Sequence, residues 1–315
     1  MILILGVTAS GKGRLSFDLA EHLGGEIISI DSMKVYRRMN IGTAKPSEEA
    51  RRRINHHLID VIEPSESFSV GRFLELASAA IDQIKSRSKP VIAVGGTALY
   101  IKALLYGLFD GPARDEQIRL NLKQRAQAEG LETLYKQLVE IDPVAAQRIH
   151  SNDLKRIIRA LEVYELTGRP ISSFQQQWEP QATGPEPRTA SHNWTIIGLR
   201  REKTVENSRI NQRVKRMIEA GLVDEVKSLL AEDRPLSMQA RCAIGYAEII
   251  DYLNGKTTLD DAVELIKKNS RRFAKSQRTW FKTFREINWL DISPNEPAEK
   301  ILGRTKTRIE NTNTG

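Results

Sequence analysis

A glycine-rich segment carrying hydroxyl side chains and a lysine follows the apolar run Ile2–Leu5 at the start of the chain. A glycine turn between a strand and a helix can aim backbone N–H groups and the positive helix N-terminus at anionic oxygens, and a lysine adds a mobile charge. We therefore predict a diphosphate site here; a glycine turn beside a surface lysine is the alternative. The predicted diphosphate-binding residues are Gly6, Val7, Thr8, Ala9, Ser10, Gly11, Lys12 and Gly13.

The position after Lys12 departs from the phosphate-loop pattern G-x-x-x-x-G-K-[ST]. That pattern has a hydroxyl at its last position, which binds Mg²⁺. This chain has Gly13 there, which carries no side-chain oxygen. We therefore expect a complete diphosphate cradle without its usual metal ligand, and we predict no protein residue as a metal ligand.

Asp31 is the carboxylate that the order of the sequence places beside this loop, since it directly follows the apolar segment Glu26–Ile30. It could bind the metal of a nucleotide hydrolase, or act as a general base for an incoming nucleophile. It could also only close a turn, as aspartate often does. Because Gly13 offers no partner oxygen, the metal-binding alternative is weakened.

Alternating strands and helices in the first hundred residues predict an α/β fold with a parallel sheet, of the P-loop NTPase-like kind. Ligands of such sheets bind beyond the carboxyl ends of the strands. Three predicted strands end in glycine or polar residues, at 6–12, 31–32 and 95–97, and we expect these ends to meet in one crevice. The predicted strands are Ile2–Leu5, Glu26–Ile30, His57–Val61, Pro90–Val94 and Trp194–Leu199, and the predicted helices are Gly11–Leu23 and Gly71–Ser86.

Between about residues 110 and 177 the strand signals disappear and the chain becomes polar and helical. Within it, a helix is predicted over Asp153–Thr167, ended by Gly168 and Pro170. We therefore predict a helical insertion over 113–189 inside an α/β core made of residues 1–112 and 190–295. Residues 296–315 are predicted to form a polar, disordered tail.

A net charge of +8 favours a polyanionic partner over a small metabolite. One predicted helix concentrates this charge in what we call the basic stripe, which spans about 80° of the helix circumference. A solvated helix face usually mixes charges of both signs, so the stripe favours binding to a phosphate backbone. The stripe contains Lys267, Arg271, Lys275, Arg278, Lys282 and Arg285, and Ile266, Phe273, Trp280 and Phe284 are predicted to form the docking face opposite.

Composition excludes several other classes of protein. No apolar run of about 18 residues is present, so no membrane span is predicted, and the apolar start is too short for a signal peptide. The single cysteine, Cys242, excludes an internal disulfide. We expect a cytoplasmic protein that acts as a monomer.

Eight short segments, in order over roughly residues 1–290, resemble tRNA dimethylallyltransferases. These enzymes move a five-carbon dimethylallyl group from dimethylallyl diphosphate to N6 of adenosine 37, beside the tRNA anticodon. The segments are Gly6–Lys12, Asp31–Tyr36, Asn40–Pro46, His56–Asp60, Gly95–Tyr100, Arg159–Val163, Ala243–Tyr246 and Arg271–Lys275.

The resemblance implies a role for each matching residue, with Mg²⁺ as cofactor. Asp31 would be the general base, Thr8 and Lys12 would hold the diphosphate, and Arg213 would neutralise it as it leaves. Ser32, Met33 and Lys34 would lie beside the target base. The remaining residues expected to contact the anticodon stem-loop are Thr97, Arg119, Lys155, Arg156, Arg159, Arg271, Lys275 and Arg278.

Three residues depart from the family. Gly13 stands where the family has Thr or Ser, Val7 replaces a proline, and Lys34 replaces the glutamine that meets the target base. Three alternative functions stay open: a P-loop phosphotransferase acting on a small metabolite, a non-catalytic tRNA-binding relative, and an enzyme that prenylates free AMP.

Overall fold

The computed structural model describes residues 1–108, 111–174, 194–284 and 287–313. The chain divides into two compact units. Unit 1 comprises Met1–Leu105 and His192–Gly315, and unit 2 comprises Tyr106–Ser191. These divisions fall near the predicted boundaries of the insertion, which were 112/113 and 189/190.

A six-stranded sheet forms the centre of unit 1, with strand order β3-β2-β4-β1-β5-β6 and parallel pairing throughout. Its inner strands are nearly continuous runs of buried residues, as expected for a parallel sheet covered on both faces. The predicted parallel α/β fold is therefore confirmed. The strands are β1 (Ile2–Gly6), β2 (Glu26–Ile30), β3 (His56–His57), β4 (Val91–Gly95), β5 (Thr195–Arg200) and β6 (Asn288–Asp291).

The predicted strand His57–Val61 is wrong except for its first residue. Leu58 and Asp60 have φ angles of 62° and 56°, in the left-handed region that an extended strand cannot contain. The chain therefore leaves the sheet directly after β3.

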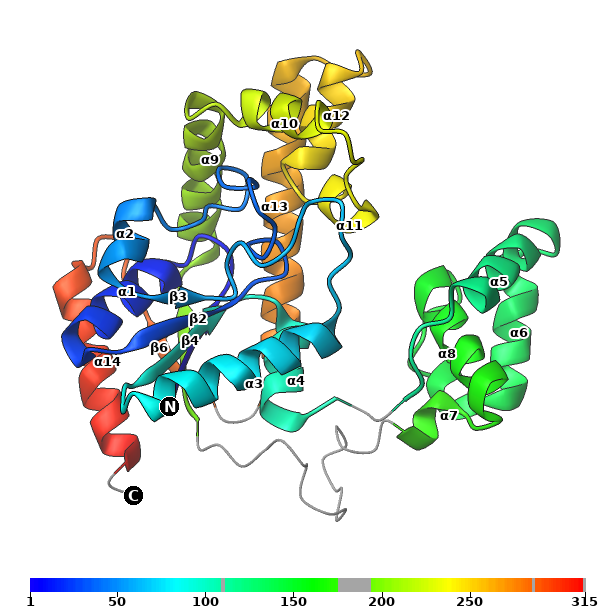
Figure 1. The fold of residues 1–315 in the computed structure, drawn as a ribbon, viewed down its shortest axis with the longest axis horizontal. Coiled ribbons are helices and arrows are strands. Elements are labelled where there is room, and N and C mark those ends of the chain that lie inside the picture. The colour runs from blue at the N-terminus through cyan, green and yellow to red at the C-terminus, as the bar shows by residue number, and fades with distance from the viewer. Residues whose placement is uncertain (109–110, 175–193, 285–286, 314–315) are drawn as a thin grey trace. The chain divides into compact units, whose positions relative to one another are not determined.

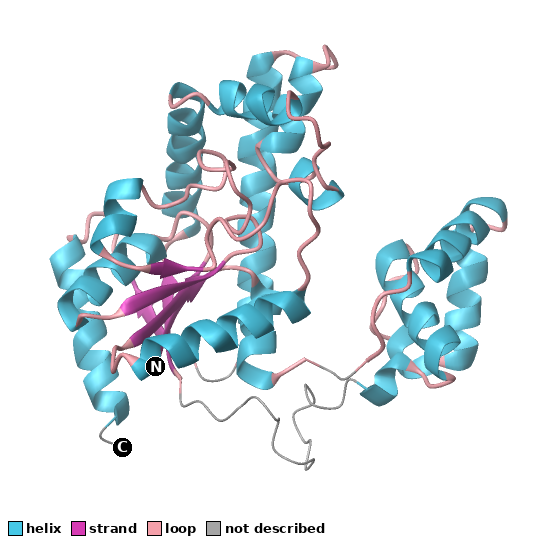
Figure 2. Cartoon of the chain, viewed as in Figure 1, coloured by secondary structure: helices cyan, strands magenta, loops and turns pink. Residues whose placement is uncertain are grey.

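Helices cover both faces of the sheet (Figures 1 and 2). Side chains of α1 and α14 pack with Ile4 and Ile197 in one apolar cluster, while α3 contacts β2 and β4 on the opposite face. The long helices α9 and α13 pack side by side at one end of the unit. The helices are α1 (Lys12–Leu23), α2 (Glu48–Arg53), α3 (Val70–Ser86), α4 (Ala98–Tyr106), α9 (Lys203–Glu219), α10 (Leu222–Leu230), α11 (Met238–Arg241), α12 (Tyr246–Leu253), α13 (Leu259–Phe281) and α14 (Ala298–Asn313).

The C-terminal segment is a helix, so the prediction of a disordered tail over 296–315 is wrong for its described part. Ile301 and Thr305 are buried, and Ile309 packs against the same cluster as α1. The spacing of these three residues, four apart, places them on one face of α14. That face is hard to detect in a sequence whose other residues are mostly polar.

The basic stripe begins at Lys267 of α13 and continues to Lys282, just past the end of the helix, but its predicted docking face is partly wrong. Phe273 is 43% exposed, whereas Ala274, Gln277 and Phe281 are buried. The helix packs through a face rotated from the predicted one, because a glutamine rather than an aromatic residue points into the sheet ends. α13 ends at Phe281, and Arg285 lies outside the described residues.

Unit 2 is helical in its described residues. Its core contains Leu122, Leu134, Leu138, Ile157 and Leu161. The predicted helix over 153–167 is confirmed, with the Asp153 side chain capping its N-terminus. The elements are α5 (Glu116–Ala128), α6 (Leu131–Ile141), α7 (Pro143–Ala146), α8 (Leu154–Thr167) and the 3₁₀ helix η1 (Ile171–Phe174).

Candidate functional site

The segment between β1 and α1 folds into a tight loop whose shape depends on its glycines. Gly11 has a φ of 103°, which favours glycine, and it precedes the first residue of α1, Lys12. A Cβ added to Gly6 would lie 2.7 Å from the Ser10 hydroxyl oxygen, so a larger residue there would displace the loop. The Lys12 ammonium donates to the Val7 carbonyl over 3.1 Å. The loop therefore has the strand–turn–helix form predicted for a diphosphate site.

Three arginines from β5 to α9 hold this loop in place. Arg201 donates to the Ser10 carbonyl over 2.9 Å and Arg209 donates to the Ala9 carbonyl over 2.8 Å. Arg213 donates to the Thr8 hydroxyl over 3.1 Å. Of these, sequence reasoning found only Arg213. The four-residue spacing of Arg209 and Arg213, which puts both on one helix face, could have revealed Arg209.

Gln277 of α13 connects the loop to the end of β4. Its Oε1 accepts from the Thr8 backbone N–H over 2.8 Å, and its Nε2 donates to the Gly96 carbonyl over 2.9 Å. The Thr8 amide is thus already bonded within the protein, and Thr8 can offer a ligand its hydroxyl rather than its backbone N–H. The sequence contained no signal for this residue beyond its place in the basic helix.

Asp31 lies at the end of β2, facing the loop. Its Oδ1 accepts from the backbone N–H groups of Met33 over 2.9 Å and of Lys34 over 3.2 Å. The next residue, Ser32, donates its N–H to the Thr97 hydroxyl over 3.1 Å. The ends of β1, β2 and β4 therefore meet in one crevice, as predicted, and Asp31 both closes a turn and faces the cavity.

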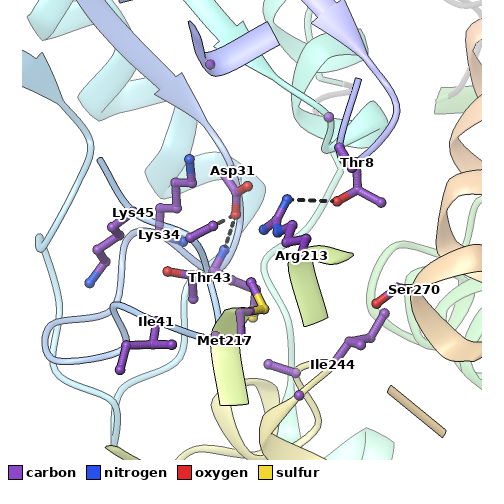
Figure 3. Close-up of a pocket in the computed structure, with 18 of the residues that line it drawn as sticks. Thr8, Asp31, Lys34, Ile41, Thr43, Lys45, Arg213, Met217, Ile244 and Ser270 are labelled. Atoms are coloured by element: carbon purple, nitrogen blue, oxygen red, sulfur yellow. Dashed lines mark hydrogen bonds between the residues drawn. The ribbon is translucent and has the colours of Figure 1, made fainter. Parts of the chain in front are cut away.

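The crevice is a cavity of about 1020 Å³ lined by residues of unit 1. Figure 3 shows its two kinds of wall. Thr8, Asp31 and Arg213 gather on one side of the view, and Ile41, Met217 and Ile244 lie on the other. The cavity thus has a polar end that contains cationic side chains and an apolar end within one space.

Charges in the polar end act strongly on one another. Burial, with the positive charges of Lys34 and Arg213, lowers the pKa of Lys12 to about 7, while Asp31 opposes the shift. Burial also lowers the pKa of Lys34 and of Arg213, and Asp31 again opposes it. A bound anion would reverse these effects, because it stabilises the charged form of each group.

The loop after β2, which forms another wall of the cavity, is held by a residue that sequence reasoning missed. Glu225 of α10 accepts from the backbone N–H groups of Asn40, Ile41 and Gly42 over 2.8 to 3.2 Å. It also accepts from the Tyr246 hydroxyl over 2.6 Å. A carboxylate 183 to 185 residues away leaves no local signal in the sequence.

Several residues predicted to bind tRNA have partners inside the protein. In unit 2, Arg119 and Arg159 both pair with the buried Glu162, over 2.8 and 2.7 Å. Lys155 and Arg156, in the first turn of α8, are exposed, and Arg156 pairs with Asp153 over 3.3 Å. On α13, Arg271 donates to Asn211 over 2.6 Å, Arg278 pairs with Glu206, and Lys275 is exposed.

Within the described ranges, no group of three or more His, Cys, Asp or Glu side chains is arranged to hold a metal ion. Gly13, at the position where the loop motif has its metal ligand, contributes no oxygen. Among the same residues, no helix is both long and apolar enough to cross a membrane.

The model of the IPP transferase family matches residues 34–284, most of the chain. The chain belongs to this family. It is 48% identical over 291 residues to a tRNA dimethylallyltransferase from Geobacter metallireducens, covering 92% of each chain. It is 44% identical over 307 residues to a tRNA dimethylallyltransferase from Acetivibrio thermocellus, covering 97% of this chain and 96% of the relative.

Solved structures agree with the family assignment and with the P-loop NTPase-like fold. The crystal structure of a tRNA isopentenylpyrophosphate transferase from Bacillus halodurans has a TM-score of 0.69 at 40% identity, covering 99% of this chain and 97% of that one. A eukaryotic dimethylallyltransferase, described as acting on tRNA, has a TM-score of 0.77 at 27% identity, covering 99% and 79%. This chain is thus a transferase, as the resemblance implied.

Proposed function

We propose that this protein transfers a dimethylallyl group from dimethylallyl diphosphate to N6 of adenosine 37 in the anticodon loop of tRNA, as a cytoplasmic monomer. One observation carries the proposal. A single cavity places an anion-binding loop and the Asp31 carboxylate at one end and apolar side chains at the other. Membership of the family supports the same reaction.

The diphosphate end supplies the stabilisation that this chemistry needs. As the bond between the allylic carbon and the diphosphate oxygen breaks, positive charge spreads over the allyl group and negative charge collects on the leaving diphosphate. Cations already in place stabilise charge where it develops. Lys12 and Arg213 occupy this position, and the Thr8 hydroxyl holds the Arg213 guanidinium.

Asp31 supplies the base. The exocyclic N6 amine of adenine is a poor nucleophile because its lone pair is conjugated with the ring. A carboxylate that takes the N6 proton while nitrogen attacks the allylic carbon restores its reactivity, which typically contributes about 10²–10⁴-fold. The new N–C bond forms, pyrophosphate departs and the proton stays on Asp31. The two N–H groups on its Oδ1 keep the carboxylate oriented.

The apolar end suits the five-carbon group. Ile41, Met217 and Ile244 line it, and no similar wall is needed by a phosphotransferase acting on a polar metabolite. Ligand cavities of about 300–1,000 Å³ bury most of a small molecule. A cavity of about 1020 Å³ therefore has room for both a prenyl diphosphate and one extruded purine.

Extracting the target base costs a few kcal/mol of stacking energy, least in an unpaired loop, which favours an anticodon loop as the substrate. The exposed Lys155, Arg156 and Lys275 are available to phosphates of the RNA. Arg119 and Arg159 are engaged by Glu162, so their contribution would come through the shape of unit 2 or through their remaining N–H groups. Mg²⁺ as cofactor stays a prediction.

Incubation of the purified protein with radiolabelled dimethylallyl diphosphate and unmodified tRNA, followed by nucleoside analysis, tests the proposal. We expect N6-isopentenyladenosine at position 37. For Asp31→Asn we expect a rate about 10²–10⁴-fold lower with nearly unchanged tRNA affinity. Consumption of ATP without transfer would favour a phosphotransferase, label on free AMP would favour the smaller substrate, and tRNA binding without transfer would favour a non-catalytic relative.

A further inference from the structure

Two hollows of unit 1 share a wall. Beside the large cavity lies a smaller one of about 390 Å³, formed by the first turns of α1 and by α2 with its flanking segments. Gly13, Ser29 and Lys34 line both hollows. Lys34 and Gly13, the position where the loop lacks its usual hydroxyl, therefore line the same two hollows.

The space at Gly13 is open. A Cβ added to Gly13 would meet no atom within 4 Å, so no neighbouring residue fills the space where a side chain at this position would lie. In the phosphate-loop pattern this is where a hydroxyl and its Mg²⁺ would contribute positive charge to the bound phosphates. Some other group must supply that charge if the loop is to hold a diphosphate equally well.

Lys34 is the charged group placed to do so. It has the largest electrostatic effect of any neighbour on Lys12, and it also acts on His56. The negative charge of Asp31 raises the pKa of Lys34, while the positive charges of Arg213 and Lys45 lower it. At the polar end Lys12, Lys34 and Arg213 thus act on one another, and each is influenced by the Asp31 carboxylate.

The ammonium of Lys34 forms no hydrogen bond or ion pair with any residue that the structure describes. Lys45, its cationic neighbour, donates to Asp60 over 2.6 Å and to Asn40 over 3.0 Å. In the described part of the chain no acceptor bonds the Lys34 ammonium, whose backbone N–H alone is held by Asp31. A half-buried cation without a partner is unfavourable, and a bound anion would satisfy it.

We propose that Lys34 binds the diphosphate of the prenyl donor on the side of the loop opened by Gly13, giving the diphosphate a hold that does not require a metal ion. The inference rests on the proposed function, because it assigns Lys34 to the donor rather than to the target base. An ammonium offers three donors and no acceptor, which suits phosphate oxygens and does not match the paired donor and acceptor of an adenine edge.

Calorimetric binding of inorganic pyrophosphate in EDTA tests the inference without tRNA or catalysis. We expect the wild-type protein to bind pyrophosphate in EDTA within about threefold of its affinity in Mg²⁺, and Lys34→Gln to bind at least tenfold more weakly in EDTA. Lys300→Gln, which removes the same charge from an exposed position of α14, is the matched control and should bind like wild type. In the double variant Lys34→Gln with Gly13→Thr, added Mg²⁺ should restore the affinity.

The inference is overturned if the wild-type protein binds pyrophosphate only with Mg²⁺, or if Lys34→Gln binds it as tightly as wild type in EDTA. Transfer assays of the same variants distinguish failure of the pyrophosphate site from failure of the proposed transfer reaction. A Lys34→Gln variant with unchanged pyrophosphate binding but altered affinity for tRNA would assign Lys34 to the base. Unaltered tRNA in every assay, with the pyrophosphate results as expected, would reject the proposed function and keep the anion site.

Discussion

The Arg213 guanidinium donates a hydrogen bond over 3.1 Å to the Thr8 hydroxyl, which joins α9 to the phosphate loop across 205 positions of sequence. The Thr8 backbone N–H is held separately by Gln277. One threonine thus connects the loop both to α13 and to Arg213, the cation that we propose faces the leaving diphosphate. Neither contact involves a neighbour in sequence.

For Thr8→Val we expect the single-turnover transfer rate to fall about 10- to 100-fold, because a hydrogen bond to a charged group is worth about 1.5–3 kcal/mol. Thr8→Ser keeps the hydroxyl and should remain within about threefold of wild type. The rates are compared at saturating donor. Equal rates for the valine and serine variants would contradict a role for this bond.

Gly13→Thr should lower the Mg²⁺ concentration that gives half-maximal transfer. The open space at Gly13 accepts a side chain, and the threonine hydroxyl restores the oxygen of the loop pattern. Gly13→Val has nearly the same shape without the oxygen and serves as control. A Mg²⁺ titration of all three proteins would reject the prediction if the threonine variant needed as much metal as wild type, or more.

Lys12 should make pyrophosphate binding depend on pH. Its pKa of about 7 leaves the ammonium partly deprotonated at pH 8 in the ligand-free protein, and the bound anion favours the protonated form. Binding at pH 8 should therefore take up more protons in wild type than in Lys12→Arg, whose guanidinium stays charged. Calorimetry in two buffers of different ionisation enthalpy measures the proton uptake of each protein. Protons taken up or released by pyrophosphate itself are the same for both proteins, so they cancel in the difference. An equal uptake in both proteins is the contrary result.

Glu225→Gln should lower both stability and activity. The carboxylate accepts from three backbone N–H groups and one hydroxyl. In glutamine one of the two oxygens is replaced by an NH₂ group, which cannot accept a hydrogen bond from these donors. We expect a loss of about 1–3 kcal/mol in the free energy of unfolding, measured with urea. Tyr246→Phe removes one of these bonds and should cost about 1 kcal/mol. A loss no larger than that of Tyr246→Phe would show that the loop is held by other contacts.

Glu26, at the start of β2 and away from the cavity, should contribute a pH-dependent share of stability. Burial alone would raise its pKa, but bonds from His57, Lys89 and Arg87 lower it to about 2. The contribution is then complete above the unfolded pKa of about 4.5 and is lost as pH falls toward 2. Glu26→Gln should be about 1–3 kcal/mol less stable at pH 7. Urea unfolding at several pH values should show that the difference in unfolding free energy between wild type and Glu26→Gln shrinks on acidification. A difference that stays constant with pH would argue against the ion pairs.

The sequence alone predicted the α/β core, the phosphate loop, Asp31 and the helical character of unit 2. These features leave local signals: a buried strand is a short apolar run, a phosphate loop needs glycine at given spacings, and parallel strands end at one edge. Because parallel strands end at one edge of the sheet, Thr8, Asp31 and Thr97 were expected to lie close together before any contact between them was known.

Only the tertiary structure decided which side chains complete the site. Gln277, Glu225, Arg201 and Arg209 act on backbone groups that are remote in sequence, and a long-range hydrogen bond imposes no periodicity on either partner. The buried face of α13 was misplaced for the same reason, since Gln277 faces inward to bond polar groups. The hydrophobic pattern of a sequence indicates which residues are buried against apolar neighbours. It does not indicate which polar residue is buried by a hydrogen bond to a distant carbonyl or amide, because that bond exists only in the folded chain.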